Sequence, residues 1–356
     1  MMITVRRTEN PKSKPDFNNL GFGKYFTDHM FLLDYDCARG WHDPRVEPYR
    51  PLSLDPASMV LHYGQEVFEG LKAYRASDGR VLLFRPLENI RRLNRSDARL
   101  CIASIAPIDE QLYLEGLKAL IRADIGWVPN LPDTSLYIRP FVIATDPYLG
   151  VRASNTYKFI IILSPVGAYY PEGMDPVRIL IETEDVRAVK GGTGEAKTGG
   201  NYAATIRAQD KAKVKGYTQV LWLDGVHRRY IEEVGTMNVF FALDGTVVTP
   251  PLEGSILPGI TRDSVIQLLR SWDVPVAERP IDIDELTAAA RSGYLDEAFG
   301  SGTAAVISPI GEFNANGSLL SVNRGQIGPL AQRLYDELTG IQWGRIDDPF
   351  GWTMEV

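Results

Sequence analysis

Short apolar runs alternate along the chain with amphipathic stretches, and this alternation predicts a mixed α/β fold. The runs are brief and rich in β-branched and aromatic residues, which is typical of strands. Asp-Gly pairs follow two of the runs and favour hairpins, so we expect antiparallel or mixed sheets rather than a doubly wound parallel sheet. The predicted strands span 135–144, 157–164, 177–183, 218–224 and 238–243.

Three further stretches repeat apolar residues at helical spacing. In the stretch 261–272 the apolar positions fall at i, i+3, i+4 and i+7, which predicts an amphipathic helix. We interpret all three stripes as helix faces turned toward a core. Their apolar residues are Tyr113, Leu117, Leu120 and Ile121; Val265, Leu268, Leu269 and Trp272; and Ile327, Leu330, Leu334 and Leu338.

The length of 356 residues favours two domains. The stretch "SPVGAYYPEGM" at 164–174 brings two prolines and two glycines between two predicted strands, so it is the best boundary. We therefore expect a small α/β domain over 1–165, a connecting loop over 166–176 and a larger α/β domain over 177–356.

Composition excludes several classes of function. Hydrophobic residues make up 44% and charged residues 23%, as in ordinary globular proteins, and no apolar run is long enough to span a membrane. The N-terminus lacks the apolar stretch of a signal peptide, so a cytoplasmic location is expected. A net charge of −7 without blocks of like charge argues against nucleic acid. Two cysteines and four scattered histidines give no disulfide framework and no metal site.

The stretch "GGTGEAKTGGNYAAT" at 191–205 sets Lys197 among glycines, and three interpretations compete for it. A phosphate-binding P-loop would need glycine where Ala196 stands. It would also place Gly199 and Gly200 in the first turn of a helix, where each costs about 1 kcal/mol. A plain surface loop explains the glycines but not the abrupt helix start that Asn201, as an N-cap, predicts. The third interpretation is a lysine for covalent chemistry, and this stretch alone does not decide between the last two.

A lysine that forms a Schiff base with pyridoxal phosphate needs a carboxylate for the pyridine nitrogen and donors for the phosphate. Glu232 and Glu233 stand just before a Val-Gly turn and a predicted strand. The segment 258–261 opens a predicted helix, whose first N–H groups form an anion site, and Arg92 could add a charge-assisted bond. Each feature has an ordinary alternative, a helix cap or a solvated charge.

Several motifs together resemble one family. They are "FTDHMF" (26–31), "LHYGQEVFEGLKAY" (61–74), "LFRPLENIRRL" (83–93), "SLYIRPF" (135–141), "GGTGEAKTGGNY", "EEVGTMN", "ILPGITRDS" and "FGSGTAA". In this order they are similar to the branched-chain amino acid aminotransferases over nearly the whole chain. These are pyridoxal-phosphate enzymes of fold type IV, a two-domain fold with the cofactor between the domains. D-amino acid aminotransferase and aminodeoxychorismate lyase share it.

The resemblance implies a role for each matching residue at the cofactor. Lys197, in the C-terminal domain, would form the Schiff base, and Glu233 would meet the pyridine nitrogen, a role that Glu232 does not match. Tyr202 would hydrogen-bond the ring oxygen, and Arg92 would bind the phosphate. The remaining cofactor-binding residues implied are Leu257 against the ring and Gly259, Ile260, Thr261 and Thr303 around the phosphate.

The resemblance also implies a substrate site. The turn at Thr303 and Ala304 would present N–H groups to the α-carboxylate, and Arg139 with Tyr137 would accept the distal carboxylate of glutamate. Val151 would reach in from the second subunit of a homodimer. The other residues expected to line the side-chain pocket are Tyr63, Phe68, Tyr169 and Met237. Animal relatives carry a redox-sensitive Cys-x-x-Cys after the "SGTA" turn, where this chain has Ala305 and Ser308, so thiol regulation is not expected.

The implied activity is transfer of the amino group between L-leucine, L-isoleucine or L-valine and 2-oxoglutarate, with ping-pong kinetics. It would serve as the final step of branched-chain amino acid synthesis or the first step of degradation, and its partners would be small molecules. Two alternatives stay open: another fold type IV enzyme acting on D-amino acids or aminodeoxychorismate, and a nucleotide-binding or non-catalytic protein using the glycine loop alone.

Overall fold

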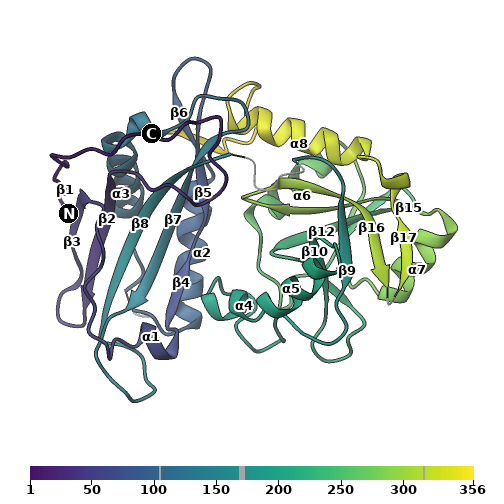
Figure 1. The fold of residues 1–356 in the computed structure, drawn as a ribbon, viewed down its shortest axis with the longest axis horizontal. Helices are drawn as coiled ribbons and strands as arrows, with labels where there is room; N and C mark the ends of the chain where they lie inside the picture. The colour runs from purple at the N-terminus through teal and green to yellow at the C-terminus, as the bar shows by residue number, and fades with distance from the viewer. Residues whose placement is uncertain (104–105, 168–172, 316) are drawn as a thin grey trace. The chain divides into compact units, whose positions relative to one another are not determined.

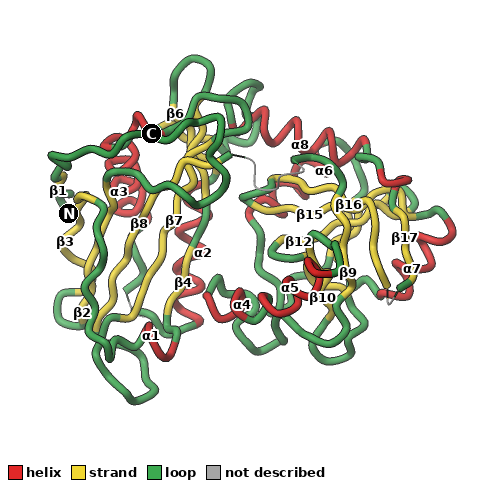
Figure 2. The backbone as a smooth tube through the Cα atoms, in the orientation of Figure 1, coloured by secondary structure: helices red, strands yellow, loops and turns green. Residues whose placement is uncertain are grey.

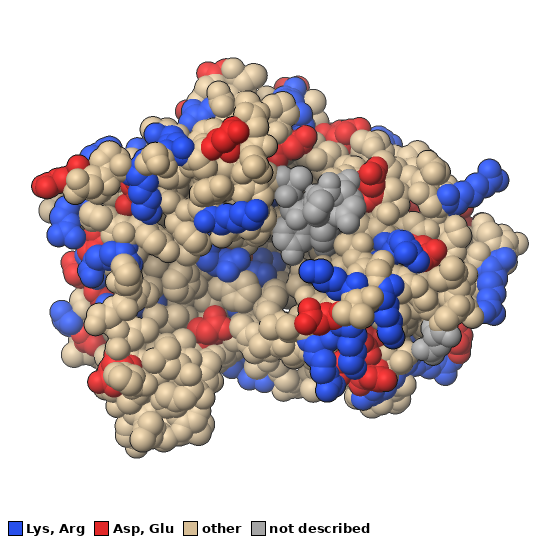
Figure 3. All heavy atoms as spheres, in the orientation of Figure 1, with Lys and Arg blue, Asp and Glu red and all other residues tan. Residues whose placement is uncertain are grey.

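The computed structural model describes residues 1–103, 106–167, 173–315 and 317–356. The chain divides into two compact units, each with its own sheet and helices (Figures 1 and 2). Unit 1 comprises Met1–Tyr169, Ala196–Gly199 and Gly340–Val356, and unit 2 comprises Tyr170–Glu195 and Gly200–Thr339. Acidic and basic side chains are interspersed over the face drawn in Figure 3.

Nine strands of the described part of unit 1 form one sheet, in the order β1-β3-β2-β8-β7-β5-β6-β18, with β4 paired to β7. The pair β1–β3 is parallel and the other pairs are antiparallel. Two predicted strands appear here: 135–144 is β7, and 157–164 lies within β8. The bounds are β1 Thr4–Val5, β2 His29–Asp36, β3 Gly40–Pro48, β4 Glu66–Phe68, β5 Leu71–Arg75, β6 Val81–Phe84, β7 Ser135–Ala144, β8 Thr156–Val166 and β18 Thr353–Glu355.

Two amphipathic helices, α2 (Pro86–Arg99) and α3 (Glu110–Ala123), cover the core of unit 1. They pack on each other, and α3 also packs on β2 and β3. Asp109 caps α3 by accepting a hydrogen bond from the Leu112 N–H. The stripe predicted from Tyr113 to Ile121 is buried, which confirms it as a core face. The shorter elements of this unit are α1 Val60–Tyr63 and the 3-10 turn η1 Ile125–Trp127.

The described strands of unit 2 run in the order β11-β10-β9-β16-β15-β12-β13-β14, with β17 paired to β16. Pairing of β11 with β12 closes six of them into a ring. Parallel pairs (β9–β10, β9–β16, β13–β14) occur beside antiparallel ones, as the mixed-sheet prediction required. The bounds are β9 Val177–Ile181, β10 Gln219–Leu223, β11 Ile231–Val234, β12 Met237–Leu243, β13 Thr246–Thr249, β14 Val276–Glu278, β15 Leu295–Gly302, β16 Val306–Ala315 and β17 Ser318–Ser321.

The helices of unit 2 largely follow the predicted stripes. Trp272 is the C-cap of the helix predicted over 261–272. The C-terminal helix begins after the first residue of its stripe, because Ile327 precedes Pro329, the first helical residue. The bounds are α4 Gly199–Ala203, α5 Ile206–Val214, α6 Ile260–Ser271, α7 Ile283–Ser292, the 3-10 turn η2 Asn323–Gly325 and α8 Pro329–Gln342, of which the part from Gly340 belongs to unit 1.

Backbone hydrogen bonds explain why two distant segments group with unit 1. The Phe68 N–H donates to the Lys197 carbonyl at 2.9 Å, which fixes the segment Ala196–Gly199 beside β4. Near the C-terminus, β18 pairs with β6, and the Arg85 N–H donates to the Trp352 carbonyl at 2.7 Å. Lys197 therefore groups with unit 1, whereas the expected domains placed it in the C-terminal part.

Candidate active site

Lys197 is held by its backbone in unit 1. Its N–H donates to the Ser96 hydroxyl on α2 at 3.0 Å, and its carbonyl accepts the bond from Phe68. Its ammonium nitrogen lies 4.8 Å from the centre of the Phe68 ring, within cation–π range. The lysine thus sits on an ordered support rather than in a freely moving loop.

The residues that follow Lys197 open α4, and Glu66 holds them. The Thr198 hydroxyl donates to the Glu66 carbonyl at 2.8 Å, and the Gly199 N–H donates to the Glu66 carboxylate. A Cβ at position 199 would lie 2.4 Å from that carboxylate, so a larger residue would require the Glu66 side chain to move. The helix nevertheless begins at Gly199, with Gly199 and Gly200 in its first turn.

The half-buried Lys197 has a pKa lowered to about 8. Burial is the main cause, because it disfavours the charged ammonium, and the positive charge of Arg92 adds to it. The negative charge of Glu69 opposes the shift in part. At pH 7 about one lysine in ten then carries the neutral, nucleophilic amine, far more than for an ordinary lysine.

Arg92 and Glu69 form a buried, two-pronged ion pair beside the lysine. Arg92 Nε lies 2.7 Å from one carboxylate oxygen and Nη2 lies 2.9 Å from the other. The Asn89 amide donates to Glu69 at 2.8 Å and the Gly70 N–H at 3.1 Å. Burial alone would raise the pKa of Glu69, but Arg92 more than offsets it and the pKa lies below its usual value. The guanidinium of Arg92 is therefore fixed in one orientation.

Arg139 and Tyr137 stand two residues apart on β7, and so on the same face of the sheet. Arg139 Nη2 donates to the Tyr137 hydroxyl at 3.1 Å, and its guanidinium carbon lies 4.9 Å from the Phe68 ring centre. The Arg139 Nε is buried and has no hydrogen-bond acceptor among the described residues. The structure thus brings Phe68, Tyr137 and Arg139 together with Lys197 within unit 1.

Two other predicted pocket residues lie elsewhere on unit 1. Tyr63, at the end of α1, is 41% exposed, and its hydroxyl donates to the Leu149 carbonyl. Val151, in the same loop as Leu149, is 85% exposed. The predicted Tyr169 lies outside the described residues.

Glu233 anchors a second cluster, within unit 2. Its carboxylate pairs with Arg187, and it accepts bonds from the Asn238 amide and the Leu257 N–H, each at 3.3 Å. Arg187 also donates to the Ser255 carbonyl at 2.7 Å and to the Gly194 carbonyl at 3.2 Å. The Glu233 carboxylate is therefore buried and faces hydrogen-bond donors.

A narrow pocket opens beside Glu233 within unit 2, and Tyr202 is among the residues that line it. Asn201 lines it too, but it is not an N-cap: α4 begins at Gly199, so Asn201 lies inside the helix. Its side chain instead exchanges two 2.7 Å hydrogen bonds with Thr193, which close the glycine loop. The lining residues are Arg187, Asn201, Tyr202, Thr205, Glu233, Gly235, Thr236 and Leu257.

The start of α6 is tied to this cluster through Asn238. The Asn238 amide donates to the Leu257 carbonyl at 3.0 Å. A Cβ on Gly259, the N-cap, would lie 2.0 Å from the Asn238 side-chain oxygen, so glycine is required. Ile260 and Thr261 then open the helix, whose positive dipole end favours an anion.

The predicted carboxylate-binding turn joins β15 to β16. Thr303 and Ala304 are half-buried within it. Met237 lies beside the end of β15, since a Cβ on Gly300 would be 2.7 Å from its methyl group. Val306 closes the turn with a φ of +61°, a backbone conformation unusual for a β-branched residue. Met237 therefore lies beside the strand that leads into this turn.

Two charged residues of these clusters were not foreseen. Glu69 stands inside the quoted motif "FEGLKAY", and its signal was an acidic residue in an apolar stretch. Arg187 stands in the loop "TEDVRAV", where nothing in the pattern distinguishes this buried arginine from the exposed arginines of other loops.

Comparison with known proteins decides the family. The family model described as "Amino-transferase class IV" matches residues 66–313. The chain is 60% identical over 354 residues to "Branched-chain-amino-acid aminotransferase 2" of Bacillus subtilis (strain 168), covering 99% of this chain and 97% of that relative. The chain belongs to the branched-chain amino acid aminotransferases of class IV. This membership confirms the predicted enzyme class and fold type IV, and it excludes the non-catalytic alternative.

Solved structures of this aminotransferase family share the fold. The crystal structure of the Escherichia coli branched-chain amino acid aminotransferase is 28% identical, with a TM-score of 0.76, and covers 92% of this chain and 98% of its own. The T.th. enzyme, solved with pyridoxamine 5'-phosphate, is 26% identical, with a TM-score of 0.74, covering 94% and 98%. No helix among the described residues is long and apolar enough to cross a membrane.

Proposed function

We propose that this aminotransferase moves an amino group between L-leucine, L-isoleucine or L-valine and 2-oxoglutarate, with pyridoxal phosphate bound covalently to Lys197. The observation that carries the proposal is a lysine amine with a pKa near 8, held on Ser96 and Phe68 beside the Arg92–Glu69 pair. The name of the 60% identical relative from Bacillus subtilis supports the substrate class.

The two clusters fit the cofactor by their chemistry. Glu233, buried and paired with Arg187, would suit a protonated pyridine nitrogen. The N-terminus of α6 and the fixed guanidinium of Arg92 suit a phosphate. Pyridoxal phosphate, when bound, supplies the electron sink for the bond that breaks at the substrate Cα. Tyr202, in the Glu233 pocket, is assigned to the ring oxygen.

Lys197 would have a second task beside a bound substrate. Its Nζ would take the proton from the substrate Cα and deliver it to the cofactor carbon C4′, and a pKa near the working pH suits a group that must both accept and donate a proton. The same lysine serves a second half-reaction with 2-oxoglutarate, which gives ping-pong kinetics.

Both kinds of substrate side chain must fit one pocket. Phe68 and Tyr137 offer apolar walls, which discriminate weakly among aliphatic groups, by about 1–3 kcal/mol per methylene. The buried Arg139 Nε, without an acceptor among the described residues, suits the distal carboxylate of 2-oxoglutarate. The turn at Thr303 and Ala304 is assigned to the α-carboxylate, with Met237 beside it.

The decisive experiment is hydride trapping on the purified protein. Borohydride should abolish a visible absorbance band and leave a phosphopyridoxyl adduct on the peptide that contains Lys197. Lys197→Ala should lose both the band and activity with L-leucine and 2-oxoglutarate, whereas Lys213→Ala, a change at an exposed lysine, should keep both. An adduct at another lysine, or none, contradicts the proposal.

Two further arms separate the alternatives. D-alanine with 2-oxoglutarate tests the D-amino acid branch, and turnover of D-alanine without L-leucine activity would reassign the substrate class.

We also propose a homodimer to which Val151, 85% exposed in the single chain, contributes a pocket residue. Light scattering on the eluting protein should give twice the chain mass of 39.6 kDa.

A further inference from the structure

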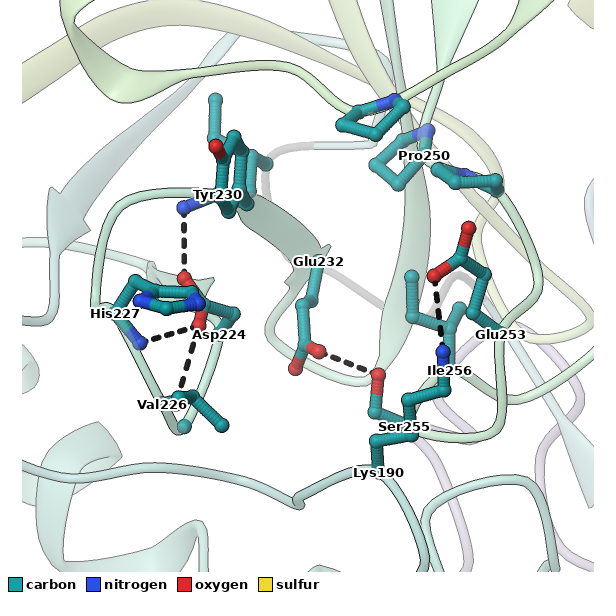
Figure 4. Close-up of a pocket in the computed structure, with 14 residues that line it drawn as sticks. Lys190, Asp224, Val226, His227, Tyr230, Glu232, Pro250, Glu253, Ser255 and Ile256 are labelled. Carbon is teal, nitrogen blue, oxygen red and sulfur yellow. Dashed lines mark hydrogen bonds and ion pairs between the residues drawn. The ribbon is translucent and has the colours of Figure 1, made fainter.

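A second pocket in unit 2 shares no lining residue with the pocket beside Glu233. It lies between the loop that joins β10 to β11 and the segment 250–256 (Figure 4). We call it the Glu232 pocket. Its lining residues are Lys190, Asp224, Gly225, Val226, His227, Tyr230, Ile231, Glu232, Pro250, Pro251, Glu253, Ser255, Ile256 and Pro280.

Glu232 supplies the buried polar group of this pocket. It neighbours Glu233 on β11, and because side chains alternate along a strand the two carboxylates point to opposite faces. Glu232 is 7% exposed; one of its oxygens accepts a bond from the Ser255 hydroxyl, and the other is buried with no donor among the described residues. Figure 4 shows the carboxyl group standing between the His227 loop and Ser255, where it faces the pocket. Burial raises its pKa.

The other acidic groups of the pocket are already matched. The Asp224 carboxylate accepts four backbone N–H groups of its own loop, from Val226, His227, Arg229 and Tyr230, at 2.6–3.1 Å. Burial would raise the pKa of Asp224, but these bonds lower it to about 2, so this carboxylate serves to shape the loop. At the rim, Glu253 lies 3.3 Å from the ammonium of Lys190 (Figure 4).

The walls of the pocket are mostly apolar. The apolar lining residues include Pro250, Pro251, Pro280, Ile256 and Tyr230. A buried carboxylate oxygen that lacks a donor, at the floor of an apolar pocket, suits a ligand that brings N–H groups and an apolar body. A planar amidinium or an ammonium meets this need, because its bond to the carboxylate is charge-assisted.

Ser255 connects this pocket to the Glu233 cluster. Its hydroxyl donates to Glu232, and its carbonyl accepts a 2.7 Å bond from Arg187, the ion-pair partner of Glu233. We propose that the Glu232 pocket binds a small organic cation with an apolar body, and that its occupation is transmitted through Ser255 and Arg187 to Glu233. The second half of this proposal rests on the function proposed above; the first half does not.

Binding is tested by calorimetry of the holoenzyme with benzamidine, a planar amidinium on an apolar ring. The wild type should bind with a Kd of about 1 mM, as expected for so small a probe. Glu232→Gln should weaken binding about tenfold or more, whereas Glu253→Gln, at the exposed rim, should change it less than about twofold. Val226→Trp places a large side chain at the mouth of the pocket, at an exposed position, and leaves Glu232 intact. This variant should not bind benzamidine. Benzoate and benzyl alcohol should not bind.

Equal affinity for the wild type and Glu232→Gln, or binding of benzoate as tight as that of benzamidine, overturns the assignment of the site.

Coupling is tested by the Kd of pyridoxal phosphate with and without saturating benzamidine. The two sites should change each other's affinity by the same factor, about threefold or more, and Ser255→Ala should abolish the change. An unchanged Kd overturns the coupling but not the site. Failure of pyridoxal phosphate to bind at all refutes the proposed function, and the calorimetry with benzamidine still decides the site.

Discussion

The buried pair of Arg92 and Glu69 gives a prediction whose size can be worked out. Glu69→Gln keeps the shape but removes the charge, so it leaves a buried guanidinium without its counter-charge. The substitution also replaces a carboxylate oxygen by an amide NH2 group near the Asn89 amide and the Gly70 N–H. Both of these are hydrogen-bond donors, so they cannot accept a bond from the new NH2 group. Breaking a buried ion pair costs about 3–5 kcal/mol, and since one neutral bond to Arg92 survives we expect about 3 kcal/mol.

Helix α2 supplies a matched control. Glu88 pairs with Arg91 at 2.8 Å, but both side chains are largely exposed, and Arg91 keeps its second partner Glu110. Glu88→Gln should therefore cost about 0.5 kcal/mol or less. Urea unfolding of both apoenzyme variants at pH 7 measures the difference in the free energy of unfolding. A Glu69→Gln variant that loses no more than Glu88→Gln would refute the reasoning.

The pH dependence of the same variant follows from linkage. The pKa of Glu69 is lower in the folded than in the unfolded chain. The contribution of its charge to the free energy of unfolding is therefore complete above the pKa of the unfolded chain, about 4.3. That contribution is lost as the pH falls through the lower folded value. The stability gap between wild type and Glu69→Gln should therefore narrow in acid, and a gap that widens below pH 4 would contradict the argument.

Three more substitutions test other groups. Arg139→Ala should raise the KM for 2-oxoglutarate about tenfold or more through loss of a charged hydrogen bond. It should change the KM for 2-oxoisocaproate less than about threefold. An equal rise in both KM values would refute the role of Arg139. Asp97→Asn should melt higher than wild type at pH 8 but not at pH 4, because burial raises the pKa of Asp97 and rising pH forces a charge into the core; an equal shift at both pH values would argue against this. Lys197→Met should stabilise the apoenzyme at pH 7, and the gain should shrink toward pH 10, since the folded pKa near 8 lies below the unfolded one; thermal melts across this range would show a constant gain if the charge were irrelevant.

Local patterns predicted much of the fold. The run 135–144 became β7 to the residue, because its length and β-branched content are set locally. The Asp244-Gly245 pair, with φ of +47° and +77°, turns the β12–β13 hairpin as expected. The N-cap prediction for Asn201 was wrong, although a polar residue before an apolar stretch is typical of a helix cap. The hydrogen-bond partner of Asn201 is Thr193, across the closed loop.

The site was harder to predict where partners come from distant parts of the chain. Motifs identified Lys197, Arg92 and Glu233 but could not show that Glu69 neutralises Arg92 or that Arg187 faces Glu233. Such pairs arise when separate elements pack, and no spacing in the sequence encodes them. Glu232 matched no cofactor role in the motifs, yet it lines a separate pocket. The residues that line this pocket come from several segments of the chain, so the sequence alone did not indicate it.

The interleaved layout of unit 1 has a consequence for how the molecule is made. Lys197 and strand β18, which pairs with β6, come from residues 196–199 and 353–355, which leave the ribosome long after residue 169. Until the final residues emerge, β6 exposes a row of unsatisfied backbone groups that invites pairing with other nascent chains. A gene cut between the two units would consequently give an N-terminal product without its lysine and with an open sheet, prone to aggregate rather than to fold by itself.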